Sequence, residues 1–121
     1  MTSDTMRTDE TRALISSSKV DDTNVYASDG EKIGHIAHLM IAKKSGQVEY
    51  AVMSSGGFLG MGSEYRPVPW DALSYDEGKD GYVLGMNKNR LPDAPSYERN
   101  ENPSWDRDYG TRVNSYYGIG A

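Results

Sequence analysis

Two histidines, His35 and His38, are the side chains whose type and spacing come nearest to a metal site in this sequence. Imidazole nitrogens bind zinc, but a zinc site needs three or four protein ligands. The sequence has no cysteine, and no aspartate or glutamate lies at a suitable spacing. A spacing of three places the two rings on opposite faces of a regular strand, so only a β-bulge would bring them together. We therefore predict no metal site and interpret both histidines as solvated or sheet-face side chains.

A glycine-rich run, Gly56–Gly62, is the segment that most resembles a phosphate-binding loop. Such a loop needs a Lys-Ser/Thr pair and a following helix, whereas here the residues at 63–65 are Ser-Glu-Tyr and predict a strand. The glycines instead allow a sharp reversal of the chain. The loop carries three apolar residues, Phe58, Leu59 and Met61. Two interpretations remain open: they plug one end of the fold, or they form an exposed contact for a partner or a second copy.

No other residues indicate catalysis or cofactor binding. The absence of cysteine excludes disulfides, thiolate metal sites and cysteine nucleophiles. The carboxylates lie singly in predicted turns, where such groups are usually solvated, and no base or nucleophile accompanies them. We therefore predict that the protein is not an enzyme and binds no cofactor.

The charge is acidic throughout the chain. Its 121 residues carry 13 Lys and Arg against 18 Asp and Glu, which gives a formal net charge of −5. Direct nucleic-acid binding and electrostatic attachment to an anionic membrane are therefore disfavoured. No apolar run approaches the roughly 18–20 residues that span a bilayer, and the N-terminus lacks the apolar region of a secretory signal. The cytoplasm is the compartment that we expect.

Strand-forming segments separated by turn residues occupy the middle of the chain. Val20–Ala27 and Ile33–Ala42 flank an Asp-Gly pair at 29–30, which is typical of tight hairpins because glycine accepts a positive φ. The irregular apolar spacing of the longer segment predicts a β-bulge near Gly34 or Ala37. The same spacing would also suit a helix, but the internal glycine and the hairpin-like flanks argue against it.

Further segments complete the predicted sheet. Val48–Ser54 alternates as a strand with little polarity on either face, which is typical of a central strand covered by a tail or a partner. Tyr65–Trp70 contains two prolines, which cannot donate ladder hydrogen bonds, so we expect an edge strand or a bulged strand. Asp71–Ser74 and Asp76–Gly81 are predicted turns, and Tyr82–Met86 is a predicted short last strand.

The two ends of the chain differ from this middle part. Residues 1–12 are polar and are predicted to be disordered, because they cannot bury enough apolar surface to offset the entropy of ordering. Ala13–Ile15 is a short apolar patch that we expect to enter the sheet as an edge strand, with a docking peptide as the alternative. Residues 13–90 form the predicted folded domain, and residues 91–121 form a C-terminal tail.

The tail contains one predicted helix at about 104–117. Ser104 is a suitable N-cap, Asp106 and Asp108 suit the first turn of a helix dipole, and Gly118 suits the C-terminal stop. Large apolar and aromatic side chains recur on one face of this helix: Trp105, Tyr109, Val113, Tyr116 and Tyr117. This face either packs on its own domain or contacts another subunit or protein partner.

Three separated segments resemble one family in their order along the chain. They are DGEKIG at 29–34, GQVEYAVMSSGGFLGMG at 46–62 and PVPWDAL at 67–73. Together they resemble the PRC-barrel family, the β-barrel of the photosynthetic reaction-centre H subunit and of ribosome maturation factors. The resemblance covers about residues 14–88, and the tail is similar to those of single-domain bacterial members. It implies a small, bent antiparallel β-barrel that acts as a binding or assembly module without a shared catalytic residue.

Fold and function are therefore predicted as follows. We expect an all-β fold, a small bent antiparallel barrel with one short helix in the tail. We expect a non-catalytic interaction module that self-associates as a dimer or higher oligomer, or that docks on a protein partner. The alternatives are an accessory protein of the ribosome or of RNA processing, and an accessory of a photosynthetic electron-transfer complex. The acidic charge argues against direct RNA contact in the first of these.

Overall fold

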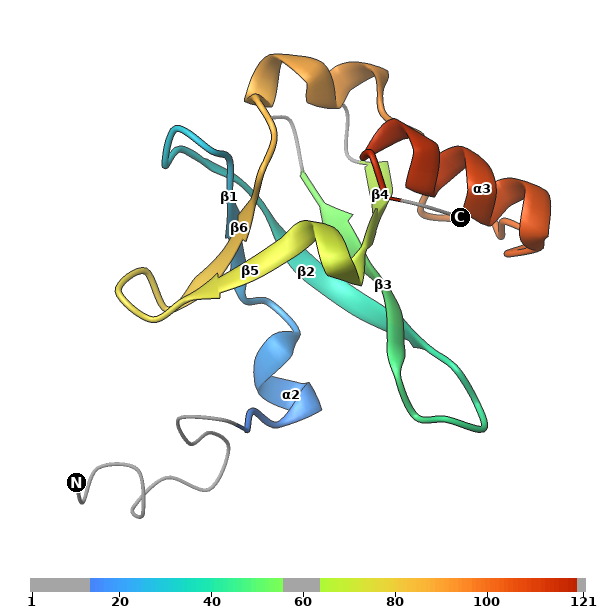
Figure 1. Ribbon diagram of the computed structural model, residues 1–121, viewed down its shortest axis with the longest axis horizontal. Coiled ribbons are helices and arrows are strands. Elements are labelled where there is room, and N and C mark those ends of the chain that lie inside the picture. Colours follow the sequence, from blue (N-terminus) through green and yellow to red (C-terminus); the bar gives the residue numbers. More distant parts are fainter. Residues whose placement is uncertain (1–13, 56–63, 120–121) are drawn as a thin grey trace.

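The computed structural model describes residues 14–55 and 64–119, and within them a bent β-sheet is the main element (Figure 1). Its seven strands lie in the order β5-β6-β1-β2-β3-β4-β7. In chain order the elements are α2 Ser17–Val20, β1 Asn24–Tyr26, β2 Lys32–Ile41, β3 Val48–Ser54, β4 Glu64–Pro69, the 3₁₀ helix η2 Trp70–Ala72, β5 Leu73–Asp76, β6 Gly81–Leu84, the 3₁₀ helix η3 Lys88–Asp93, β7 Tyr97–Glu98 and α3 Arg107–Tyr116. The prediction of a mainly β fold is confirmed.

The predicted closed antiparallel barrel is wrong in two respects. Within the described residues the sheet is open, with β5 and β7 as its end strands. These strands have four and two residues, and no ladder joins them to each other among the described residues. In addition, β1 and β6 run parallel, with Val25 beside Tyr82, while the other neighbouring strands are antiparallel.

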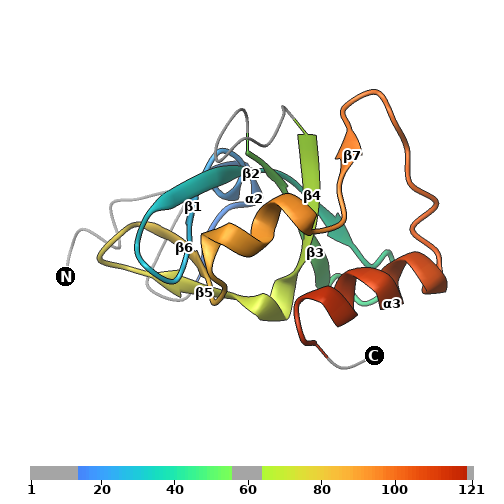
Figure 2. The same ribbon diagram turned by 90° about the horizontal axis from the view of Figure 1, so that it is seen from above.

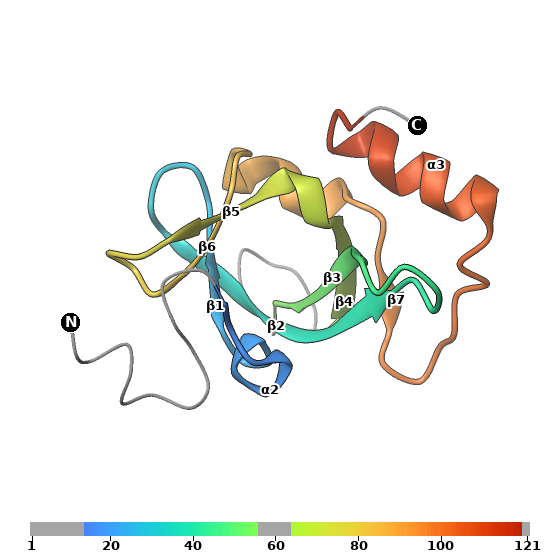
Figure 3. The same cartoon turned by 60° about the horizontal axis from the view of Figure 1, so that its bottom comes forward.

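The long strand β2 carries the predicted bulge. Its pairing with β3 shifts between Ile36 and His38, so Ala37 is the extra residue, and a second shift follows between Met40 and Ile41. A bulge increases the local twist of a strand. This agrees with the strong curvature of β2, which crosses the whole sheet in Figure 3. The hairpin between β1 and β2 is also confirmed, since Gly30 at its turn has a φ of 90°.

Two short segments differ from the prediction. Of the edge strand expected at 13–15, Ile15 forms a single-residue β-bridge and residue 13 lies outside the described residues; the helix α2 follows, and its N-cap Ser16 accepts a hydrogen bond from the Ser18 amide. The turn expected at 71–74 is correct in its first half only, because Leu73 and Ser74 belong to a strand. The chain makes one 3₁₀ turn after Pro69 and then enters β5, which pairs with β6 around the correctly predicted turn before Gly81.

The core lies on one face of the sheet. Its fully buried members include Ile33 and Ile36 from β2 and Met53 from β3. Leu91 of η3 has no exposed surface and belongs to the same cluster, so the core continues past residue 90 into the C-terminal segment. Val52 is equally buried but lies outside this cluster, because alternation along β3 directs it to the opposite face.

The segment after β6 wraps around the β4 side of the sheet. Figure 2 shows it pass from η3 through β7, continue without regular structure and return as α3. Arg66 of β4 holds its first part: the buried guanidinium donates through Nε to the Leu91 carbonyl at 3.0 Å and lies 3.3 Å from the Glu64 carboxylate. The C-terminal segment therefore contacts both faces of the sheet: Leu91 and the end of α3 contact the core side, and Gly110 of α3 meets Tyr50 on the opposite face.

The tail helix begins later than predicted. Asp106, and not Ser104, is the N-cap, and its carboxylate accepts a hydrogen bond from the Tyr109 amide at 2.9 Å. This bond, with a second from Ser104, lowers the pKa of Asp106. The predicted stop at Gly118 is confirmed: it has a φ of 74°, and its amide donates to the Ser115 carbonyl while that of Ile119 donates five residues back. These two bonds form a Schellman motif.

Candidate interaction surface

Five partly buried aromatic rings form one connected surface, which we call the aromatic ridge. Its members are Tyr50, Tyr65, Tyr97, Trp105 and Tyr109. Ring centroids lie 5.6 Å apart for Tyr65–Tyr97, 6.2 Å for Tyr97–Trp105, 5.4 Å for Trp105–Tyr109 and 5.6 Å for Tyr50–Trp105. The first three pairs meet edge to face, the arrangement that aromatic quadrupoles favour at such distances.

Strand alternation places the ridge on the face opposite the core. Tyr65 lies across the β3–β4 ladder from Ser54, which shares a face of β3 with Tyr50. Ala51 and Met53, which alternate with these positions, belong to the core cluster. One pair of strands thus supplies apolar side chains to the core and tyrosines to the opposite face.

The tail completes the ridge through an unusual backbone conformation at Trp105. This residue has a φ of 57°, and a bulky side chain rarely occupies the left-handed region. Its ring contacts three other rings of the ridge. One turn into α3, a Cβ on Gly110 would lie 2.7 Å from the Tyr50 hydroxyl, so the absence of a side chain there lets the helix approach β3.

Two arginines lie over the ridge. The Arg99 guanidinium is 5.4 Å from the Tyr65 ring centroid and donates to the Ser54 hydroxyl at 2.8 Å. The Arg112 guanidinium is 5.2 Å from the Tyr109 ring centroid. Cations over aromatic faces are attracted by the ring quadrupole. Tyrosine, tryptophan and arginine are also the residues that dominate binding energy in protein interfaces.

The ridge is uncharged at neutral pH. Burial raises the pKa of Tyr97 to about 12, and the neighbouring hydroxyls of Tyr109 and Tyr65 add to the effect. Burial also raises the pKa values of Tyr50 and Tyr109. These phenols therefore keep their protons under physiological conditions. The surface is suited to apolar, cation–π and hydrogen-bonding contacts.

The helix face predicted from the sequence packs on its own sheet. Trp105 and Tyr109 lie in the ridge, Val113 has no exposed surface, and Tyr116 and Tyr117 pack against the core cluster at the other end of α3. The Tyr116 hydroxyl also donates to the Arg90 carbonyl. Of the two alternatives for this face, the intramolecular one is observed, and contact with another protein stays a prediction.

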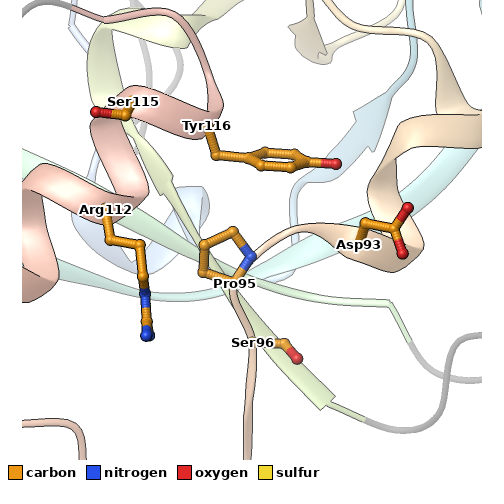
Figure 4. A pocket seen from close by; sticks show the side chains of 6 residues that line it. All are labelled: Asp93, Pro95, Ser96, Arg112, Ser115 and Tyr116. Carbon is orange, nitrogen blue, oxygen red and sulfur yellow. The ribbon is translucent and has the colours of Figure 1, made fainter.

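A groove of about 610 Å³ runs between α3 and the segment that leads into β7. Its lining residues are Asp93, Pro95, Ser96, Arg112, Ser115 and Tyr116. Figure 4 shows the Tyr116 ring above Pro95, with Arg112 and Asp93 on either side. The groove is therefore polar at both ends and apolar in the middle.

Among the other predicted residues, His38 adjoins this surface through the Tyr65 ring. Phe58, Leu59 and Met61 lie outside the described residues. His35 and His38 have different neighbours: the Nε2 of His35 is 3.8 Å from an Asp22 carboxylate oxygen, and the ring of His38 meets Tyr65 edge to face at 5.4 Å.

Two absences concern the described part of the chain. Residues 14–55 and 64–119 contain no group of three or more His, Asp or Glu side chains that could hold a metal ion. In the same ranges, no helix has the length and apolar character needed to cross a membrane.

Sequence reasoning found the tail half of the ridge and missed the strand half. The alternation of Val48–Ser54 predicts that the tail or a partner covers the face of Ala51 and Met53, whereas those residues belong to the core cluster and the tail lies against Tyr50 on the other face. Tyr65, Tyr97 and Arg99 gave no local signal, because they meet only through the pairing of β4 with β7, in which Tyr65 lies beside Tyr97. The one hint that the sequence offers is Tyr97 itself, an aromatic residue close after Pro95.

Comparison with known proteins agrees with the sheet and its segment order. The family model described as the PRC-barrel domain matches residues 13–85, which span α2 to β6 and end before η3. No curated protein matches the chain. The tail, with β7 and α3, lies beyond the matched residues, so the ridge joins a family strand pair to a segment outside the family model. Since the match covers more than half of the 121 residues, the chain belongs to the PRC-barrel domain family.

Proposed function

We propose that this chain is a non-catalytic protein-interaction module that self-associates through the aromatic ridge and its two arginines. The ridge is the observation that carries the proposal. Five partly exposed aromatic rings and the guanidinium groups of Arg99 and Arg112 share one face. This composition is typical of the energetic centre of protein interfaces, where charged residues other than arginine are depleted.

The chemistry of the site also supports binding over catalysis. Tyr50, Tyr97 and Tyr109 have raised pKa values, so they lack the tuning toward neutral pH that a general acid or base needs. Fully burying one large side chain contributes about 1.5–3 kcal/mol, and the ridge residues are already partly buried in the monomer. Several of them must therefore contribute together to give a stable dimer.

Charge reversal at the ridge tests this proposal. Arg99 and Arg112 are exposed, so replacing both by glutamate leaves the core intact while it removes two cation–π contacts and adds repulsion. Sedimentation velocity of the full chain over a wide concentration range would measure the dimer dissociation constant. We expect the R99E/R112E chain to dimerise about tenfold or more weakly, equivalent to about 1.4 kcal/mol or more.

The matched control places the same charge change far from the ridge. Lys43 and Lys44 lie in the turn between β2 and β3, and the K43E/K44E chain has the same net charge as the ridge variant. We expect its dissociation constant to stay close to that of the unmodified chain. An unmodified chain that remains monomeric at every concentration would reject self-association. Equal weakening by both pairs would instead assign the effect to net charge and reject the ridge.

A further inference from the structure

The connection between β7 and α3 is strained and has little backbone pairing of its own. Residues 101–106 form neither helix nor strand, and Trp105 within them occupies the left-handed region with a φ of 57°. Short hinge loops under strain favour domain exchange, because the open form relieves the strain while it keeps every other contact. Six residues in extended conformation span up to roughly 20 Å, enough for α3 to leave its own sheet.

The attachment of β7 is also weak. It pairs with β4 at only two positions, and one of them sets Glu64 opposite Glu98. Like charges directly opposite each other in an antiparallel pair are destabilising. Beyond β7, α3 packs at one end on the outer face of the sheet, where Gly110 lies against the Tyr50 hydroxyl, and at its other end Tyr116 and Tyr117 pack against the core cluster. The same contacts can be made by the α3 helix of the same chain or by the α3 helix of a second copy.

We propose that two copies of this chain exchange α3, so that the helix of each copy seats on the β3–β4 face of the other. The occupant of the face is thus a second copy of the same segment, and residues 101–106 are the hinge. This proposal deepens the proposed self-association and rests on it. In the exchanged dimer the hinge extends, Trp105 leaves the left-handed region, and the contact between Gly110 and Tyr50 forms between the two copies.

A size-complementary pair of variants tests the exchange in the full chain. Gly110→Ala adds a Cβ 2.7 Å from the Tyr50 hydroxyl and 3.9 Å from Tyr50 Cζ, so Tyr50→Phe removes the clash and leaves ordinary contact. G110A chains and Y50F chains, one of them labelled with ¹⁵N, are unfolded and refolded together, and native mass spectrometry counts the dimers. An exchanged heterodimer has no clash, whereas an exchanged G110A homodimer has two.

The expected result is a strong preference of G110A chains for Y50F partners. Relief of each clash is expected to change the dimer equilibrium by roughly tenfold, so heterodimers should far exceed the G110A homodimer. The matched control mixes the G110A/Y50F double variant with the unmodified chain. Each of these is free of clashes alone, and their exchanged heterodimer has one clash. The bias in this control should therefore be reversed, toward homodimers.

The outcomes separate the two proposals. Opposite biases in the two mixtures support the exchange. Dimers in statistical proportions in both mixtures would show that each α3 stays on its own sheet, which overturns the exchange and leaves self-association intact. Monomers throughout would overturn both. Chemical denaturation of G110A with and without Y50F measures the clash itself, and Gly110→Val replaces the alanine variant if the two stabilities are equal.

Discussion

The family-matched sheet and the C-terminal segment are held together by different interactions. In the sheet, side chains such as Ile33, Ile36 and Val25 are almost fully buried, and backbone ladders join neighbouring strands. The C-terminal segment has a two-residue strand, rings that stay partly exposed, and two tyrosine hydroxyls that are buried without a hydrogen-bond partner within the described residues. Among the large apolar side chains of this segment that the structure describes, only Leu91 and Val113 are as deeply buried as the sheet core.

The fold therefore combines two kinds of region. The sheet is held by buried apolar side chains and backbone ladders, and the C-terminal segment is docked on it mainly by side-chain contacts. Loss of the docked region exposes aromatic rings but breaks few backbone hydrogen bonds. Local opening of such regions has a smaller free energy than global unfolding.

The largest effect is expected from the core. Ile36 has no exposed surface, and Ile36→Ala should lower the free energy of unfolding by about 2–5 kcal/mol, because it loses transfer free energy and leaves a cavity. Urea denaturation followed by far-ultraviolet circular dichroism measures this loss. We expect the whole chain to unfold at a lower urea concentration in one transition, because the tail has no surface to pack against once the sheet is unfolded.

Val113→Ala is the equivalent change in the tail and should have a smaller and local effect. Val113 also has no exposed surface, and truncating its side chain should destabilise the docked helix by about 1–2 kcal/mol. Amide hydrogen exchange should rise in α3 and stay unchanged in β2 and β3. Equal acceleration of exchange in both regions would show that sheet and tail unfold as one unit, and the comparison above would be wrong.

The success of the sequence-based predictions also differs between short-range features and contacts between distant segments. Strands with local signals were predicted well: Val48–Ser54 alternates, and the Asp-Gly turn and the bulge at Ala37 are short-range features. The one-turn helix α2 and the strand β5 were missed, because four residues give too little periodicity to identify.

Features that depend on contacts between distant segments could not be predicted. The open sheet, the parallel pairing of β1 with β6 and the meeting of Tyr65 with Tyr97 each join segments far apart in the chain. Arg66 is a further example: the sequence gives no sign that this strand residue is buried and bonded to the Leu91 carbonyl. In the tail, spacing identified the helix face but not which surface it contacts.

Alkaline pH should release the tail before it unfolds the sheet. The pKa of Tyr97 is raised to about 12 from its ordinary value of 10 because the folded state disfavours the charged phenolate. Its contribution to stability is thus complete below pH 10 and is lost as the pH rises from about 10 to about 12. In a Trp70→Phe background, fluorescence of Trp105 reports the docked tail during this titration.

The control for this titration is Tyr97→Phe, which removes the group and keeps the ring. We expect the fluorescence change to move to higher pH in this variant, with a smaller residual change from Tyr50 and Tyr109, whose pKa values are also raised. An unchanged midpoint would mean that ionisation of Tyr97 is not what weakens docking.

The smallest effects are expected at two adjacent tyrosines, and they should have opposite signs. The Tyr117 hydroxyl is buried without a hydrogen-bond partner within the described residues, and burial strongly raises its pKa. Tyr117→Phe removes this desolvated group and should stabilise the docked helix by about 1 kcal/mol. Tyr116→Phe instead removes the hydroxyl that donates to the Arg90 carbonyl and should destabilise it by about 0.5–1.5 kcal/mol.

Comparing the two variants separates the effect of the hydroxyl group from that of the ring. Both variants keep the aromatic contact between the two side chains, whose centroids are 5.5 Å apart. Thermal unfolding and hydrogen exchange in α3 measure both effects. Destabilisation by Tyr117→Phe would show that its hydroxyl has a partner in solution. In that case the tail is held more firmly than its contacts indicate, and exchange of α3 between copies would lose one of its physical reasons.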